Sequence, residues 1–146
     1  MGPHPGPTKA ITANAQGAQN SWRLANLVIA NHIQVAALVE TKFSIQKFAD
    51  FATFCHKNGL QVFAANHPTI ARADDRTYCS GGVVIMVHKS LKAKPVKSWS
   101  SAEGDACCVD LEFDFLTGIY KPREANHHAL IDEILECQLF TRQGAP

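Results

Sequence analysis

The sequence predicts a mixed α/β fold, and three observations lead to that prediction. Two short apolar runs, residues 10–13 and 35–39, are separated by a segment with helical spacing, which is typical of parallel strands joined by a helix. Residues 82–87 form a strongly apolar run suited to a strand buried on both faces. Residues 107–114 alternate apolar and polar side chains, as in a half-buried strand antiparallel to its neighbours. This combination favours an α/β sandwich with a mixed sheet and flanking helices over a purely doubly wound sheet.

The first half of the chain is predicted to alternate strands and helices. Trp22, Ala25 and Val28 recur at helical spacing and give the first helix an apolar face. Ser44 is an N-cap candidate for the second helix, and Asn58-Gly59 supplies its C-terminal stop. The expected elements are a strand at 9–14, a helix with Asn20 or Ser21 as its N-cap, a strand at 34–40, a helix from Ser44 to about residue 58, and a strand at 60–64.

The second half is predicted to contain mostly strands. Residues 66–79 are polar and contain Pro68, so we expect a long surface loop there. The remaining expected elements are strands at 82–87, 94–99 (an edge strand), 107–114 and 116–120, and a final helix over about residues 125–140.

The composition is that of one globular domain. The chain has 146 residues, of which 46% are hydrophobic and 18% charged, and this suffices for a real core. Pro3, Pro5 and Pro7 block regular structure, so residues 1–8 are predicted to be a disordered leader and residues 9–143 the domain. No apolar run reaches the roughly 18–20 residues that span a bilayer, and we expect no membrane contact.

Charge and cysteine usage exclude several classes of function. A formal net charge of +1 does not indicate a nucleic-acid binder, although Lys89, Lys92, Lys94 and Lys97 form a local basic run. The five cysteines form no Cys-x-x-Cys pair and no secretory signal precedes them, so reduced thiols and an intracellular location are expected. No Gly-x-Gly-x-x-Gly or Gly-x-Ser-x-Gly motif indicates a dinucleotide site or a hydrolase elbow.

A polar residue ends each of the first two expected strands. Asn14 follows residues 10–13, and Glu40 follows residues 35–39. If both strands run parallel in one sheet, these residues lie side by side at its carboxyl edge, where open α/β sheets bind ligands. A carboxylate and an amide there could hold a divalent cation and an anionic substrate.

Four motifs in order resemble one known superfamily. They are Thr12-Ala13-Asn14-Ala15-Gln16-Gly17, Val39-Glu40-Thr41-Lys42, Ser80-Gly81-Gly82-Val83-Val84-Ile85 and Gly118-Ile119-Tyr120-Lys121-Pro122. Together they resemble the N-terminal part of the endonuclease/exonuclease/phosphatase (DNase I-like) superfamily, and the Thr12–Lys42 segment resembles endonuclease domains of non-LTR retrotransposons. The resemblance implies a partial four-layer α/β sandwich and a phosphoesterase that uses Mg²⁺ or Mn²⁺, with a nucleic acid, DNA in particular, as the expected partner.

The resemblance also implies a role for individual residues. Glu40 matches the metal-binding glutamate, Asn14 the asparagine that positions metal and phosphate, and Tyr120 a tyrosine that donates a hydrogen bond to the phosphate. Each has a plainer alternative: Glu40 could be a solvated strand end, Asn14 a turn-forming residue and Tyr120 a half-buried aromatic. The glycines of Ser80-Gly81-Gly82 are predicted to be structural, because they permit a sharp turn into a buried strand.

The chain departs from the superfamily pattern in two ways. Val39 stands where a glutamine usually precedes the glutamate, and the later Gly-Asp-Phe-Asn and Asp-His motifs are missing. The resemblance therefore implies a domain whose C-terminal half is absent, with no evident general base and little or no activity alone. We expect mainly one of the two sheets, with its inner face open to water, and therefore a complementing C-terminal half or self-association.

Two other classes of function remain open from the sequence. The chain could be a non-catalytic module that binds nucleic acid or protein through its sheet and the basic run, or an unrelated small α/β binding domain. The sequence does not decide between DNA, RNA and small phosphoesters as substrates.

Overall fold

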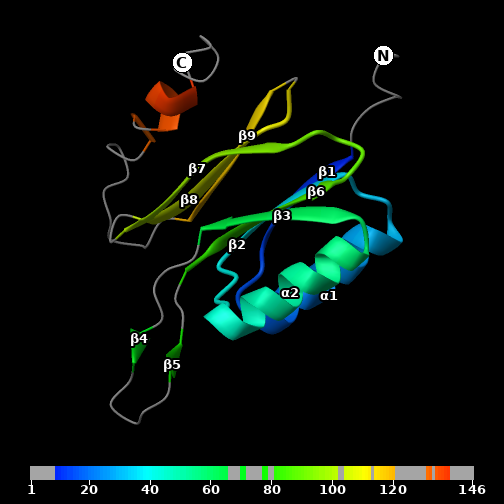
Figure 1. Cartoon of the computed structure of the whole chain (residues 1–146). Helices are drawn as coiled ribbons and strands as arrows, with labels where there is room; N and C mark the ends of the chain where they lie inside the picture. Colours follow the sequence, from blue (N-terminus) through cyan, green and yellow to red (C-terminus); the bar gives the residue numbers. More distant parts are fainter. Residues whose placement is uncertain are drawn as a thin grey trace.

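The computed structural model describes residues 9–65, 70–71, 77–78, 81–101, 104–112, 114–120, 131–132 and 134–138. Within these residues, two helices cover one face of a four-stranded sheet, and a three-stranded sheet packs against the other face (Figure 1). The predicted α/β sandwich with a mixed sheet and flanking helices is confirmed.

The four-stranded sheet has the order β1-β2-β6-β3. It is formed by β1 (Ala10–Asn14), β2 (Val35–Val39), β3 (Leu60–Ala65) and β6 (Val83–His88). Strands β1 and β2 are parallel, as the crossover helix predicts, whereas β6 is antiparallel to both β2 and β3. The first five residues of β6 are completely buried, so the expected strand with two covered faces is present.

Helix α1 (Ala18–Ala30) begins earlier than the sequence predicts. Its N-cap is Gly17, and Ser21 lies inside the first turn, where its hydroxyl donates a hydrogen bond to the Gly17 carbonyl at 2.9 Å. The predicted start at Asn20 or Ser21 is therefore wrong. A serine that bonds a carbonyl four residues earlier is compatible with a helix interior, and the cap preference alone does not distinguish the two positions.

Helix α2 (Ile45–Lys57) begins and ends as predicted. The Ser44 hydroxyl accepts a hydrogen bond from the Lys47 amide at 3.2 Å, and Asn58 is the C-cap. The two helices pack on the sheet through a shared aromatic cluster, in which the rings of Phe43 and Phe51 lie 4.7 Å apart.

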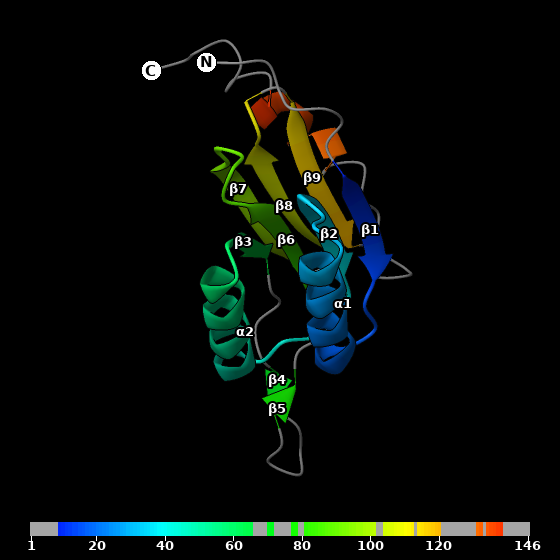
Figure 2. The same ribbon diagram turned by 90° about the vertical axis from the view of Figure 1, so that its right-hand side faces the viewer.

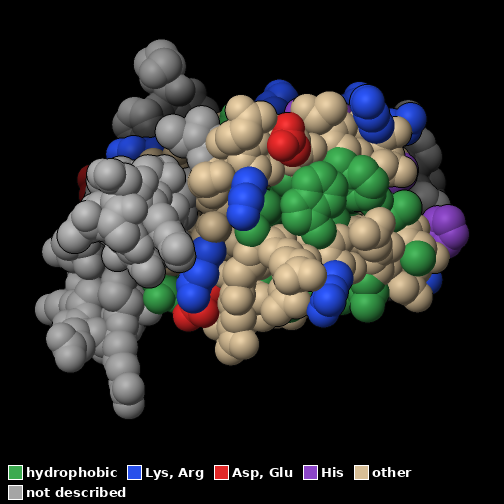
Figure 3. Space-filling view, turned by 90° about the horizontal axis from the view of Figure 1, so that it is seen from below, with side chains coloured by type: hydrophobic (Ala, Val, Ile, Leu, Met, Phe, Trp, Pro, Cys, Tyr) green, Lys and Arg blue, Asp and Glu red, His purple; other side chains and the backbone are tan. Residues whose placement is uncertain are grey.

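The outer surface of the helical layer carries a hydrophobic patch. In Figure 3, hydrophobic side chains gather over this layer and Lys and Arg side chains surround them. Trp22 of α1 and Phe54 of α2 are both partly exposed and have ring centroids 5.1 Å apart, while Leu27 is 46% exposed.

No helix in the described part of the chain is long and apolar enough to cross a membrane.

The second sheet has the order β7-β8-β9 and is antiparallel throughout. It is formed by β7 (Lys94–Ser101), β8 (Gly104–Asp110) and β9 (Phe115–Tyr120). The predicted alternation over residues 107–114 is confirmed in part: Cys107, Val109 and Leu111 are buried and Asp110, Glu112 and Asp114 are not, but Cys108 is buried as well, and the strand ends at Asp110. Cys107 faces the four-stranded sheet, and Cys108 packs with Trp99 and Ile134 on the opposite face. Residues far along the chain cover this outer face, and alternation within one strand cannot reveal them.

The inner face of the four-stranded sheet is covered rather than open to water. Val35, Ile85 and Val87 of this sheet form one hydrophobic cluster with Cys107 and Val109 of β8. The expectation that the chain supplies mainly one sheet is therefore wrong. The two sheets approach closely at Gly118 in β9, where an added Cβ atom would lie 2.6 Å from the Val83 Cγ1 atom.

The expected loop at residues 66–79 contains two very short strands. Strands β4 (Ile70–Ala71) and β5 (Thr77–Tyr78) pair with each other and project beyond the helices in Figure 2. Of the predicted final helix, residues 131–132 and 134–138 are helical, and the rest of its range lies outside the described residues, as does the predicted leader at 1–8.

Candidate functional site

Asn14 and Glu40 meet at one end of the four-stranded sheet. In the parallel pair of β1 and β2, Asn14 is in register with Val39, the residue before Glu40. The Ala15 amide donates to the Val39 carbonyl at 2.8 Å and continues the ladder past Asn14. The predicted placement of the amide and the acid at a shared edge is confirmed.

The Asn14 side chain also builds the turn that leads into α1. Its Oδ1 atom accepts a hydrogen bond from the Gln16 amide at 3.0 Å, which is the geometry of an Asx turn. Gln16 has a φ of +54°, in the left-handed region. The turn-forming alternative for Asn14 therefore holds. Because an amide oxygen has two lone pairs, the same side chain keeps the capacity to contact a ligand.

Glu40 has an unusual backbone conformation. Its φ is +54°, and that of Lys42 is +52°, although neither residue is glycine. Such a conformation costs on the order of 1–3 kcal/mol per residue and persists only where neighbouring groups enforce it. The Gly17 amide donates to the Glu40 carbonyl at 2.9 Å, and the Lys42 amide donates to the Gly81 carbonyl at 2.9 Å. Hydrogen bonds to two loops, at Gly17 and at Gly81, therefore hold the segment that carries Glu40.

Tyr120 ends β9 and reaches Glu40 from the second sheet. Burial first, then the negative charges of the nearby Glu40 and Asp105 carboxylates and the interaction of the hydroxyl with Glu40, raise the pKa of Tyr120 above its usual value. Tyr120 therefore stays protonated at neutral pH and can donate a hydrogen bond. All three predicted site residues converge at this end of the molecule.

Sequence reasoning missed Asp105. This residue begins the buried part of β8, is completely buried, and pairs in register with Tyr120. Its Oδ2 atom accepts a hydrogen bond from the Gly82 amide at 2.8 Å. A lone acid early in an apolar strand was the available signal, but only the strand register places it beside the site.

The residues present suit a divalent cation that keeps most of its water. Among the described residues, no three His, Cys, Asp or Glu side chains form a metal-binding group. The available oxygen ligands are the Glu40 carboxylate and the Asn14 amide oxygen, and Mg²⁺ commonly binds one or two carboxylates plus waters and substrate phosphate. Next to Glu40, the buried Thr41 hydroxyl has no hydrogen-bond partner. This donor set fits Mg²⁺ and does not fit a metal that needs several soft ligands.

A hollow of about 410 Å³ opens beside Asn14. It lies between β1 and β2 on one side and β9 on the other, and its lining includes Thr12, Asn14 and Thr117. Both β1 and β9 occupy an edge of their sheets among the described strands, and Figure 2 shows them along the same side of the sandwich. The hollow could admit a ligand or a further segment of polypeptide next to the candidate site.

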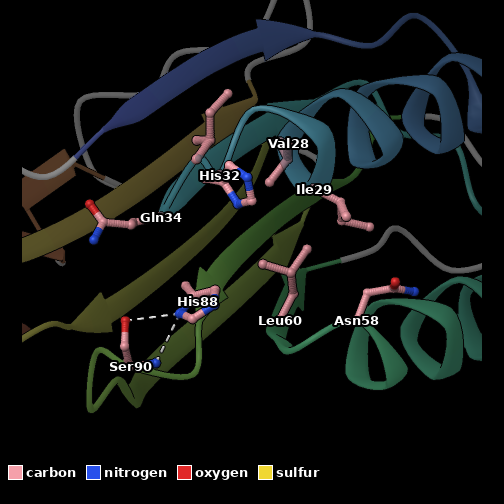
Figure 4. Close-up of a pocket in the computed structure, with 9 residues that line it drawn as sticks. Val28, Ile29, His32, Gln34, Asn58, Leu60, His88 and Ser90 are labelled. Carbon is pink, nitrogen blue, oxygen red and sulfur yellow. Dashed lines mark hydrogen bonds between the residues drawn. The ribbon is translucent and has the colours of Figure 1, made fainter.

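A second hollow of about 390 Å³ lies at the opposite end of β2 and β6. Figure 4 shows His32 and His88 in it, from different elements. The His88 Nδ1 atom accepts a hydrogen bond from the Ser90 amide at 3.1 Å and also contacts the Ser90 hydroxyl at 2.9 Å. Ser90 therefore occupies the Nδ1 atom of His88. The predicted site residues lie at the other end of the sheet.

The basic run lies away from these residues. Lys94 and Lys97 are on β7, an edge strand of the second sheet, and Lys97 lies 5.4 Å from the centre of the Trp99 ring. Lys89 and Lys92 are exposed in the connection before it. Lysines are common on edge strands, where they discourage pairing with other chains.

The fold defines a class: a two-sheet α/β sandwich with an outer helical layer and an acid, an amide and a phenol at one end. The structure is similar to that of an endonuclease/exonuclease/phosphatase family protein from Leptotrichia buccalis C-1013-b, with a TM-score of 0.52 and 13% sequence identity. The match covers 86% of this chain and 60% of that chain, so this chain spans about three fifths of the solved protein's length. At this identity the likeness shows the fold, a partial DNase I-like sandwich. No family model and no curated protein matches the sequence.

Proposed function

We propose that this chain carries the cation- and phosphate-binding half of a Mg²⁺-dependent phosphoesterase site that descends from a nuclease. The single observation that supports the proposal best is the convergence of Asn14, Glu40 and Tyr120 from three strands and two sheets. The left-handed conformation of Glu40 adds support, because such strain is concentrated at functional sites.

Each residue has a defined chemical role in this proposal. Glu40 contributes the negative charge that binds Mg²⁺ or Mn²⁺, and the Asn14 amide contacts the cation or a phosphate oxygen. Tyr120, whose phenol is protonated at neutral pH, donates a hydrogen bond to a non-bridging phosphate oxygen. The bound cation would stabilise negative charge on the phosphate. The resemblance of the Thr12–Lys42 segment to retrotransposon endonucleases makes DNA the first substrate to test.

We expect the Glu40→Gln substitution to weaken binding of Mn²⁺, used as a substitute for Mg²⁺, by about tenfold or more, which corresponds to about 1.4 kcal/mol. The substitution keeps the size of the side chain and removes the charge that attracts the cation. The measurement is free Mn²⁺ by electron paramagnetic resonance during titration of the wild-type and variant chains.

Glu112→Gln is a matched control for this titration. Glu112 also has a left-handed backbone, with a φ of +74°, but it lies in the turn between β8 and β9, at the end remote from Tyr120. Equal Mn²⁺ affinity in the wild type and Glu40→Gln, or an equal loss in both variants, would remove the basis for the proposal.

The purified chain is expected to show little or no Mg²⁺-dependent nicking of supercoiled DNA. Asn14, Glu40 and Tyr120 bind charge but provide no group that deprotonates an attacking water, and phosphoryl transfer needs that water positioned. We propose that a complementing polypeptide segment in the hollow beside Asn14 supplies the missing groups. Measurable turnover by the chain alone, abolished by Glu40→Ala, would show that the expectation of inactivity is wrong.

A non-catalytic nucleic-acid module is the second candidate function. It is favoured by the exposed lysines at and before β7, an edge strand. In that case DNA affinity would fall steeply with salt and would depend on Lys92 and Lys94 but not on Glu40.

A further inference from the structure

Asp105 is a completely buried carboxylate that joins the two sheets. It belongs to β8 of the three-stranded sheet, whereas its hydrogen-bond donor, the Gly82 amide, belongs to the segment that enters β6 of the four-stranded sheet. A buried carboxylate is costly unless it is well hydrogen bonded, and a charge-assisted bond of 2.8 Å is a strong one. Its position therefore calls for a specific role.

The glycine pair that Asp105 contacts has a backbone that other residues rarely adopt. The φ angles are +70° at Gly81 and +96° at Gly82. This conformation lets the Gly82 amide bond to Asp105 while the Gly81 carbonyl accepts from the Lys42 amide at 2.9 Å. The Gly82 carbonyl also lies 3.5 Å from the Thr41 amide nitrogen. Two hydrogen bonds therefore connect Asp105 to the segment that carries Glu40: one from the Gly82 amide to Asp105, and one from the Lys42 amide to the Gly81 carbonyl.

The Glu40 segment depends on such restraints. Glu40 and Lys42 both have left-handed backbones, and the φ of Glu40 sets the direction in which its side chain leaves the end of β2. Tyr120 lies near that carboxylate and stands in register with Asp105 on the next strand. Asp105 is therefore linked both to the Gly81-Gly82 segment, which holds the Glu40 backbone, and to Tyr120, which lies near the Glu40 carboxylate.

We propose that Asp105 is a positioning residue for the Glu40 site: by anchoring Gly81-Gly82 it holds the left-handed Glu40–Lys42 segment and so aims the Glu40 carboxylate. The part of this inference that concerns the cation rests on the proposed function. The anchoring itself is a property of the apo protein and can be measured without any metal.

The test compares Asp105→Ala with Asp105→Asn by NMR hydrogen exchange and by Mn²⁺ titration. Alanine removes the acceptor, whereas asparagine keeps an oxygen of similar position that can accept from the Gly82 amide. Two controls are matched to these changes. Asp110→Ala removes another carboxylate of β8 that accepts a backbone amide at 2.8 Å, and Leu60→Ala destabilises the helix-side core, away from the Gly81-Gly82 segment.

In Asp105→Ala, exchange at the Gly82 and Lys42 amides is expected to accelerate by about tenfold or more beyond any global loss of stability. Mn²⁺ affinity is expected to fall by about tenfold, because the carboxylate is no longer held in place. Asp105→Asn should restore most of both properties. The Asp110→Ala and Leu60→Ala variants should keep wild-type Mn²⁺ affinity while folded.

The outcomes separate this inference from the proposed function. If Lys42 exchanges no faster in Asp105→Ala than in Leu60→Ala, the anchoring is overturned whatever the metal does. If exchange accelerates and Glu40→Gln loses Mn²⁺ but Asp105→Ala retains wild-type affinity, the positioning role is overturned and the proposed function stands. If the wild-type chain binds no Mn²⁺, the proposed function fails, while faster exchange at Lys42 still supports the anchor.

Discussion

Gly118→Ala is expected to destabilise the protein by about 2–3 kcal/mol, because it overpacks the interface between the sheets. The new Cβ atom would lie 2.6 Å from the Val83 Cγ1 atom, and Val83 is completely buried. Real Cβ atoms do not approach so closely, so Val83 must change rotamer or β9 must move outward. The measurement is urea unfolding of the wild type and the variant at neutral pH.

The double variant Gly118→Ala with Val83→Ala gives a sharp control for the steric cause. Removing the Val83 methyl groups takes away the atom that clashes, so the two substitutions together should cost less than the sum of their separate effects. Ile119→Ala, a change at a 38% exposed neighbour, should have a small effect. Additive costs in the double variant would mean that the sheets do not meet at this glycine.

Stability is expected to fall steeply as the pH rises above about 9. Burial raises the pKa of the Cys55 thiol to about 12, and burial together with the neighbouring Cys108 raises that of Cys107 to about 12. A raised pKa in the folded state gives stability that is present below the unfolded pKa, near 9, and is lost as the pH rises toward 12. The upper limit is about 4 kcal/mol for each thiol, from three pH units at about 1.4 kcal/mol each.

Urea unfolding from pH 7 to 10.5 measures this dependence. Cys55→Ala and Cys107→Ala each remove one titrating thiol, so each should flatten the alkaline limb even though each also leaves a small cavity. Cys137→Ala is the matched control, because Cys137 is only partly buried. An unchanged alkaline limb in the double variant Cys55→Ala with Cys107→Ala would contradict this expectation. Tyr120 also has a raised pKa and titrates in the same direction, above its usual value of 10.0.

The elements of the four-stranded sheet and its helices could be predicted because local patterns determine them. The apolar runs at residues 35–39 and 82–87 gave the two central strands, and Ser44 marked the start of α2 correctly. The start of α1 was wrong because Asn20 and Ser21 are as acceptable inside a first turn as at a cap.

The sequence did not indicate that the second sheet covers the inner face of the four-stranded sheet, because the contacts between them join residues far apart in the sequence. Cys107 and Val109 of β8 pack on Val35 and Val87, and no pattern within one strand indicates such a partner. The burial of Cys108 depends on Ile134, which lies still farther along the chain. Alternation showed that residues 107–110 form a strand but not that both of its faces are covered.

The placement of Asn14 and Glu40 followed from one rule, because parallel strands end at the same edge of a sheet. The direction of Glu40 did not follow, since it depends on left-handed backbones at Glu40 and Lys42 and on bonds from Gly17 and Gly81. Asp105 was missed for the same reason, because its partner Gly82 lies 23 residues away in the chain. The functional roles of Asn14, Glu40 and Tyr120 stay predictions.

The most direct test of the central claim is the location of Mn²⁺ in crystals of the wild-type chain by anomalous scattering. We expect a peak in direct contact with a Glu40 carboxylate oxygen, at the edge shared with Asn14 and Tyr120, and no such peak in crystals of Glu40→Gln. A Mn²⁺ peak found only elsewhere on the chain, or the same peak in both proteins, would contradict the assignment of Glu40 as the cation ligand.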